Sequence, residues 1–238
     1  MPSRYIIKEF IPRGIYHVYN RGVDKRDIFQ DNMDYRFFLS LLRVYLVPVE
    51  EQRKKGSTLS TIRKGEFVGR IEVLAYALMP NHYHLLIRQT NEDDLSAFMK
   101  AVMTNYVMYY NKKYARVGSL FQGVYKAILV TNDDYLVHLS RYLHLNPLTK
   151  GLNPFGGKTL EKGSTLRALL IDQYTSYADY LQVRETKWVN PGYILNYFAH
   201  TTAAQLSRIK SYEEFVAVAD GLAVDTEILG KQAIDGDA

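Results

Sequence analysis

Two histidines, a tyrosine and an amide in this chain have the types and the spacing needed for phosphodiester chemistry. His82 and His84 flank a single aromatic residue in an apolar run typical of a β-strand. Because successive side chains of a strand point to opposite faces, both imidazoles lie on one face and can bind the same metal ion. Tyr142 and Asn146 stand four residues apart, on one face of a predicted helix. This set indicates a metal-assisted phosphodiester site, with Tyr142 as the nucleophile.

Each of these residues also has a purely structural interpretation. A His-X-His pair on a strand is more often structural than metal-binding, and any one of the 20 tyrosines is more often a packing residue. Asn146 could satisfy backbone groups at the end of its helix before Pro147. The periodicity favours chemistry for the tyrosine, because the leucines of the same helix already supply an apolar stripe. We therefore do not expect Tyr142 to be needed for the core.

The composition sets limits on the class of protein. With 238 residues and 47% hydrophobic content, the chain fits one compact domain with a helical tail. A net charge of +5 suits a polyanionic partner without requiring one. The absence of cysteine excludes disulfides and thiolate metal sites. No apolar run is long enough to span a bilayer and no signal peptide is visible, so we expect a cytoplasmic protein with no membrane partner.

The elements that must position the chemical residues follow the order βα, ββ, α, β, α. Strands are predicted at 14–20, 71–78, 82–88 and 124–130, and helices at 31–48, 93–113 and 131–146. A turn at Pro80-Asn81 joins the second and third strands into a hairpin with both histidines on its second arm. Pro147 is expected to end the helix that carries Tyr142. This order predicts an α+β fold, a ferredoxin-like antiparallel sheet with helices on one face.

The rest of the chain is predicted to be less regular. Segment 49–69 is basic and polar, and is interpreted as a long loop or a small hairpin. Beyond Pro147 we expect a glycine-rich linker, three short amphipathic helices and a frayed end, at 151–163, 174–181, 193–198, 212–222 and 230–238. The chain is accordingly divided into a nuclease domain at 1–150 and a mainly helical C-terminal extension at 151–238.

Four motifs, in this order, carry a resemblance to a known family. They are Tyr16-His-Val-Tyr-Asn-Arg-Gly22, Ala75-Tyr-Ala-Leu-Met-Pro-Asn-His-Tyr-His-Leu-Leu86, Gly118-Ser-Leu-Phe-Gln122 and Tyr142-Leu-His-Leu-Asn-Pro147. Over about 12–150 the chain resembles the single-tyrosine HUH transposases, and among them the REP-associated tyrosine transposases. The resemblance implies an endonuclease and strand transferase for DNA transposition. Its partner would be single-stranded DNA that folds into hairpins, and we expect a monomer or a homodimer.

The resemblance also implies a role for each chemical residue. A divalent ion, Mg²⁺ or Mn²⁺, would be bound by His82 and His84 and would polarise the scissile phosphate. Asn146 matches the position of a third ligand in the family. Tyr142 would attack phosphorus and leave a 5′-phosphotyrosine link and a free 3′-hydroxyl, which explains why no ATP motif is needed. A tyrosine hydroxyl has an ordinary pKa near 10, so a base must accept its proton, and the sequence does not identify that base.

Two departures from the family pattern and two alternatives qualify the functional hypothesis. The segment 49–69 is longer than is usual in the family. Val124 stands where the family often has a basic residue, and Lys126 could compensate. A replication or conjugation initiator would use the same HUH chemistry, although the order of motifs follows the transposases. A non-catalytic module is the other alternative, because aromatic-rich ferredoxin-like sheets also bind single-stranded nucleic acid by stacking. No aromatic run of the RNA-recognition type is visible. A covalent adduct with hairpin DNA in Mn²⁺ would separate enzyme from module.

Overall fold

The computed structural model describes residues 10–53, 65–149, 166–200 and 211–217. Its strands form one antiparallel sheet in the order β2-β3-β1-β4, built from β1 (Ile15–Arg21), β2 (Ile71–Met79), β3 (His82–Gln89) and β4 (Lys126–Leu129). Helix α1 (Asn32–Leu46) connects β1 to β2, and α3 (Asp94–Lys113) connects β3 to β4. This is the ferredoxin-like order, and it confirms the predicted fold class.

The β2–β3 hairpin holds the two histidines, and its tip is anchored from outside. Met79 pairs with His82 across the predicted Pro80-Asn81 turn. The turn carbonyls accept hydrogen bonds from the β1–α1 connection: Pro80 O from the backbone N–H of Ile28 and Phe29, and Asn81 O from that of Gly22. This connection also contains the short 3₁₀ helix η1 (Val23–Lys25). Because the tip is fixed to the connection, the first histidine has a defined position.

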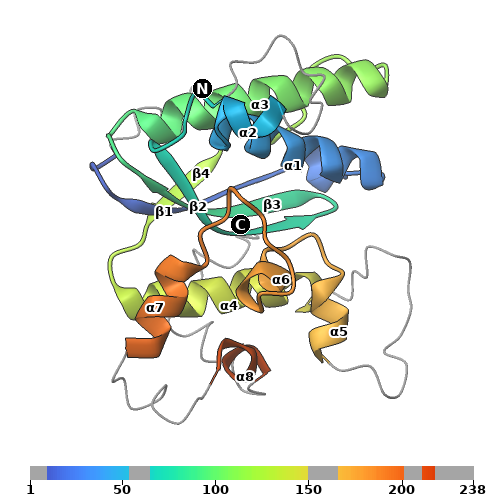
Figure 1. The fold of residues 1–238 in the computed structure, drawn as a ribbon. Helices are drawn as coiled ribbons and strands as arrows, with labels where there is room; N and C mark the ends of the chain where they lie inside the picture. Colours follow the sequence, from blue (N-terminus) through green and yellow to red (C-terminus); the bar gives the residue numbers. More distant parts are fainter. Residues whose placement is uncertain (1–9, 54–64, 150–165, 201–210, 218–238) are drawn as a thin grey trace.

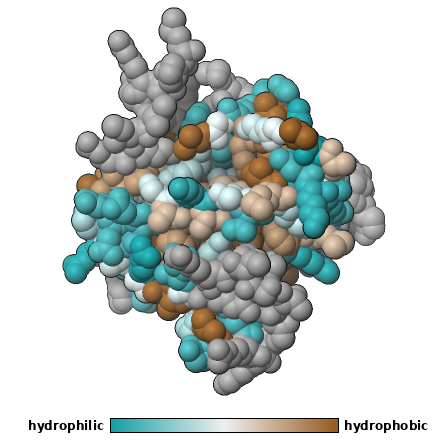
Figure 2. Space-filling view, turned by 90° about the horizontal axis from the view of Figure 1, so that it is seen from above, coloured by the Kyte–Doolittle hydropathy of each residue, from teal (hydrophilic) through white to brown (hydrophobic). Residues whose placement is uncertain are grey.

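One face of the sheet packs against α1 and α3, as predicted (Figure 1). Asp31 begins α1 with a capping box that pairs it with Asp34. The buried Asp34 carboxylate also accepts hydrogen bonds from α3 and the residue that follows it: Tyr109 Oη at 3.0 Å, Tyr114 Oη at 2.8 Å and Lys113 Nζ at 2.7 Å. These charge-assisted contacts tie the two helices together. The face that they present to solvent has hydrophilic residues among hydrophobic ones (Figure 2).

The opposite face of the sheet is covered by α4 (Asp133–Thr149) and by helices of the C-terminal extension (Figure 1). The extension contributes α5 (Leu166–Ile171), α6 (Tyr177–Tyr180), α7 (Gly192–His200) and α8 (Tyr212–Ala217). A second core fills this layer, where small residues of β2 such as Ala75 and Ala77 pack with the buried leucines of α4. The sheet is therefore the middle of three layers, and the chemical face of β3 points toward α4.

The extension also protects the edge strand β2. Backbone hydrogen bonds run from Leu78 N to Tyr174 O (2.9 Å), from Ser176 N to Tyr76 O (3.0 Å) and from Asn190 N to Val73 O (2.8 Å). An edge strand with free N–H and C=O groups would otherwise be a template for pairing with another chain. Segments of the extension thus complete the sheet on this side.

Helix α4 differs from its prediction at its C-terminal end. It begins as expected, with the Asn132 side chain accepting a hydrogen bond from Tyr135 N at 2.7 Å. It then continues through Pro147 to Thr149, whereas the sequence predicted an end at Asn146. Proline disfavours helical geometry at the residue before it, yet α4 continues here, where its leucines pack in the second core. Because proline has no N–H, the carbonyl of Leu143 lacks its usual intrahelical donor here.

The segment interpreted as a loop at 49–69 is partly helical. Helix α2 (Val49–Arg53) forms at its start, because Gln52 Nε2 donates to the carbonyl oxygens of Val44 and Val47 at the end of α1 (2.9 and 2.5 Å). Residues 54–64 of this segment, the expected linker at 151–163 and the expected frayed end at 230–238 lie outside the described residues. No helix in the described ranges is both long enough and apolar enough to cross a membrane.

Candidate active site

The strand register places the chemical residues of three strands on one face. Paired residues of neighbouring strands share a face, and Tyr19 of β1 lies between His84 of β3 and Lys126 of β4. His82 pairs with Arg21 in the next row. Tyr83, between the two histidines, points into the opposite core and is fully buried there. The alternation expected from the sequence therefore holds, and both imidazoles face the α4 layer.

His82 has a defined proton arrangement. Its Nδ1 lies 2.6 Å from Oδ1 of Asn81, and the Asn81 amide is oriented by its own hydrogen bond from Nδ2 to Lys25 O at 3.2 Å. An amide oxygen only accepts hydrogen bonds, so Nδ1 of His82 carries the proton. The lone pair of the neutral ring is then on Nε2, the nitrogen that can bind a metal.

His84 is held by a third histidine. Its Nδ1 lies 2.8 Å from Nε2 of His17, which is fully buried on β1, and the two rings stack with centroids 5.0 Å apart. When Nδ1–H of His84 donates to His17, the lone pair of His84 is also on Nε2. The ring centroids of His82 and His84 are 5.1 Å apart. Both imidazoles can thus offer Nε2 to a shared ion.

Tyr142 reaches this pair from α4. Its ring stands edge-on to that of His84, with centroids 6.0 Å apart and an interplanar angle of 87°, and its side chain is buried. Tyr135 and Asn146 lie on the same stripe of α4 as Tyr142, two turns before it and one turn after it. The structure therefore brings the predicted nucleophile to the predicted metal ligands, across a long separation in sequence.

A metal at this position would require an unusual third ligand. In the described ranges, no group of three or more His, Cys, Asp or Glu side chains could hold an ion. The third protein donor would have to be an amide such as that of Asn146, which is buried on α4. Two imidazole nitrogens and an amide oxygen fit a divalent ion of the first transition row, and of the two expected ions they suit Mn²⁺ better than the oxygen-seeking Mg²⁺.

His138 and Arg141 of α4 face the extension. His138, one turn before Tyr142, has its Nδ1 3.1 Å from an Arg141 amino group, which is a donor, and its ring contacts Phe215 of α8. Arg141 also donates to Phe215 O at 3.1 Å and lies over the Phe215 ring. Nδ1 of His138 accepts a hydrogen bond from Arg141, so this nitrogen cannot also accept the proton of Tyr142.

His144 links α4 to two parts of the extension. Its Nδ1 lies 2.8 Å from Tyr212 Oη on α8, and its Nε2 lies 2.8 Å from Ser176 Oγ, just before α6. Complete burial, with a smaller effect from the charge of Arg184, lowers the pKa of His144 to about 3. The imidazole is neutral at physiological pH and acts as a hydrogen-bonding link between layers.

Asn81 and His17 support the two histidines, but the sequence predicted no role in the site for either residue. Asn81 was assigned only to the hairpin turn, and His17 only to a motif. Alternation along β1 puts His17 on the same face as Tyr19, which is a signal in the sequence. The pairing of β1 with β3, which brings His17 to His84, is not local and could not be read from either segment.

Part of the chain matches a family of known proteins. Residues 47–146 match the family model described as "Transposase IS200 like", which confirms the resemblance to single-tyrosine transposases, and the matched segment contains all four chemical residues. The curated proteins gave no match. Among solved structures, the chain is similar to a REP-associated tyrosine transposase bound to a REP hairpin, at 12% identity, with 79% of this chain and 97% of the other covered and a TM-score of 0.49. A Deinococcus radiodurans R1 protein provisionally assigned as a transposase gives 14% identity, 64% and 97% coverage, and a TM-score of 0.34.

Proposed function

We propose that this chain, whose residues 47–146 match the IS200-like transposase family, nicks and rejoins single-stranded DNA near hairpins through a covalent 5′-phosphotyrosine intermediate. The observation that carries the proposal is the edge-on position of Tyr142 beside His84, in a buried site that also holds His82. The proposal includes a nuclease domain at 1–150, an extension at 151–238 and action in the cytoplasm as a monomer or homodimer.

Each residue of the site has a task in this reaction. His82 and His84 would hold the ion through Nε2, and Asn146 would add its amide oxygen. A bound Mg²⁺ or Mn²⁺ would supply Lewis-acid polarisation of the scissile phosphate. Asn81 and His17 fix the orientation of the two imidazoles through the Nδ1 atoms.

The chemical step exchanges one phosphate ester for another. Oη of Tyr142 attacks phosphorus, the bond to the 3′-oxygen breaks, and the tyrosine proton is balanced by the proton gained at the departing 3′-hydroxyl. A 3′-hydroxyl can later attack the phosphotyrosine and restore a phosphodiester. Because the bond energy is kept in the covalent link, rejoining needs no nucleotide cofactor.

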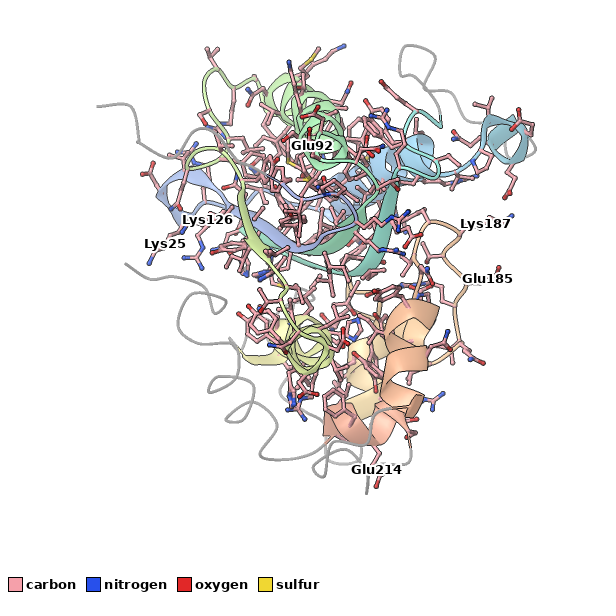
Figure 3. The ribbon with its side chains drawn as sticks, turned by 90° about the vertical axis from the view of Figure 1, so that its left-hand side faces the viewer. Lys25, Glu92, Lys126, Glu185, Lys187 and Glu214 are labelled. Carbon is pink, nitrogen blue, oxygen red and sulfur yellow. The ribbon has the colours of Figure 1, made fainter. Side chains whose placement is uncertain are left out.

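Surface charge supports a nucleic-acid partner at this end of the molecule. Lys25 and Lys126 project from the same end of the sheet, and Glu185 and Glu214 lie away from them (Figure 3). Together with the net charge of +5, this arrangement favours a polyanion approaching the histidine face. The proposed substrate is single-stranded DNA with a hairpin.

A covalent-adduct assay tests the function. The protein is incubated with Mn²⁺ and hairpin oligonucleotides with single-stranded flanks, and denaturing gels report any linked DNA. We expect an adduct with the natural protein and none with Tyr142→Phe, which keeps the ring and removes only the attacking oxygen. Tyr135→Phe, on the same stripe of α4, is the matched control and should retain the adduct.

The outcomes of this assay are distinct. An adduct that persists in Tyr142→Phe and disappears in Tyr135→Phe would move the nucleophile to Tyr135. Reversible binding without any adduct in the natural protein would overturn the enzyme and favour the non-catalytic binding module.

A further inference from the structure

A cavity of about 150 Å³ opens beside His82, on the histidine face of the sheet. Its lining comes from β1, from the start of β3 and from the segment that leads into β4, and includes Tyr19, Arg21, His82, Gln122, Gly123 and Lys126. Unlike the two cores, this cavity is lined mainly by polar and charged side chains, with the Tyr19 ring and the apolar Val124 among them. Apart from His82, none of these residues has a task in the chemistry assigned to Tyr142.

The wall of the cavity is built by hydrogen bonds. Asn20 Nδ2 donates to Gly123 O at 3.0 Å, and Asn20 Oδ1 accepts from Arg21 N at 2.9 Å. The backbone N–H of Gln122 donates to Arg21 O at 3.0 Å. Asn20, which also lines the cavity, therefore joins the two segments. The wall exists before any ligand binds, as is usual for specific pockets.

The lining has the groups that recognise one nucleotide. Tyr19 is half-buried, and its ring lies 5.7 Å from that of His84, while Lys126 Nζ lies 5.7 Å from the Tyr19 centroid. Arg21 stands opposite His82 in the strand register. Gln122 is exposed, and its amide offers both hydrogen-bond donors and an acceptor. An aromatic ring for stacking, cations for phosphate and an amide for a base edge are the usual elements of single-strand binding.

We propose that this cavity binds one unpaired nucleotide of the DNA strand, next to the scissile phosphate. The proposal rests on the proposed function. His82 lines the cavity and, as a metal ligand, would lie beside the scissile phosphate, so a nucleotide in the cavity would be next to that phosphate. The base stacks on Tyr19, Lys126 and Arg21 contact the phosphate, and Gln122 contacts the base edge. A cavity of this size has room for a single base.

The test measures binding without cleavage. The protein carries Tyr142→Phe, the buffer contains EDTA, and the probe is a stable DNA hairpin with single-stranded thymidine flanks in which one nucleotide at a time lacks its base. We expect one abasic position to weaken binding about ten-fold, equivalent to about 1.4 kcal/mol and within the range for base–aromatic stacking. Tyr19→Leu should weaken binding of the intact probe by the same factor. In this variant, the probe that lacks that base should bind as well as the intact probe.

Control variants separate stacking from general damage. Tyr19→Phe keeps the aromatic ring and should bind as the parent does. Tyr193→Leu changes an aromatic residue of α7, where it lies under Arg88, and should leave the abasic profile unchanged. Lys126→Ala should weaken binding at low salt, whereas Lys100→Ala, the same change on the exposed side of α3, should not.

The inference and the proposed function can fail separately. If the abasic profile is the same in Tyr19→Leu and its parent, the cavity does not hold a base, even when the natural protein forms an adduct. If Tyr19→Leu removes the effect of one abasic position but the natural protein forms no adduct, the nucleotide site is supported and the transposase function is refuted.

Discussion

Nε2 of His17 and Nδ1 of His84 are 2.8 Å apart in a fully buried, stacked pair. One proton lies between the two nitrogens, and its position decides which nitrogen of His84 has a lone pair for a metal. A neutral His17 with its proton on Nδ1 accepts from His84 and leaves Nε2 of His84 as the ligand atom. The central strand β1 thus controls the metal-binding form of a residue on β3.

The first prediction concerns this support. His17→Ala removes the acceptor and should weaken Mn²⁺ binding about 10- to 100-fold, the usual effect of losing a partner behind a metal ligand. His17→Gln, whose amide oxygen can accept a hydrogen bond, should restore part of the affinity. Calorimetric titration with Mn²⁺ measures both. His138→Ala, on the side of α4 that faces α8, is the control, and equal affinity in all four proteins would dismiss the role of His17.

The two metal ligands themselves give the second prediction. His82→Ala and His84→Ala each remove one nitrogen donor, so each should reduce Mn²⁺ affinity and abolish adduct formation. Hairpin binding in EDTA should remain, because the cations that contact phosphate are untouched. Unchanged Mn²⁺ affinity in the double variant would refute the metal site.

Local patterns predicted much of this site. Alternation placed His82 and His84 on one face, and helical spacing placed Tyr142 and Asn146 together, because both properties depend only on neighbouring residues. The hairpin and the element order followed from turn and periodicity signals. What local patterns could not supply was the register that brings particular side chains of distant segments together. His17 meets His84 only through strand pairing, and His138 turns to α8 only because the extension packs there.

The course of α4 illustrates a second limit. Pro147 is a strong local signal for a helix end, yet the helix continues to Thr149. A proline inside a helix costs about 3 kcal/mol, and α4 continues past it where the helix packs between the sheet and the extension. That packing is a property of the complete fold. The rule that proline ends a helix therefore gave the wrong end for α4, where tertiary contacts are dense.

A third prediction tests the departure at Val124. This residue lines the cavity and is 70% exposed, so a lysine there would add a cation without disturbing the core. Val124→Lys should tighten binding of a hairpin with a single-stranded flank, and should make the log–log salt slope more negative by about 0.7 for one added phosphate contact. Fluorescence anisotropy across a salt series measures this. Val183→Lys, in the extension, is the control, and an equal gain there would indicate nonspecific attraction.

The fourth prediction concerns pH and the link through His144. The folded pKa of about 3 lies below the ordinary value of 6.5, so between these values the unfolded chain binds more protons than the native state. The free energy of unfolding should therefore fall as pH decreases below 6.5, by up to about 1.4 kcal/mol per pH unit from this residue. Urea unfolding of the metal-free protein at pH 6.5 and at lower pH measures the slope. His144→Gln should flatten it, and an identical slope would show that His144 protonates freely in the folded protein.

The last prediction concerns the third ligand. Asn146→Ala should weaken Mn²⁺ binding while the helix persists, because the side chain is one of three proposed donors. Asn146→Asp replaces an amide oxygen with a carboxylate, which hard cations prefer, so the difference in affinity between Mn²⁺ and Mg²⁺ should narrow. A buried carboxylate is also costly without a counter-charge.

Added Mg²⁺ should therefore raise the melting temperature of Asn146→Asp more than that of the natural protein. Asn105→Asp, on α3 and far from the histidine face, should show no such gain. If Asn146→Ala binds Mn²⁺ as tightly as the natural protein, the amide is not a ligand and contributes only to the packing of α4. His82 and His84 would then be the protein ligands, and water would supply the rest.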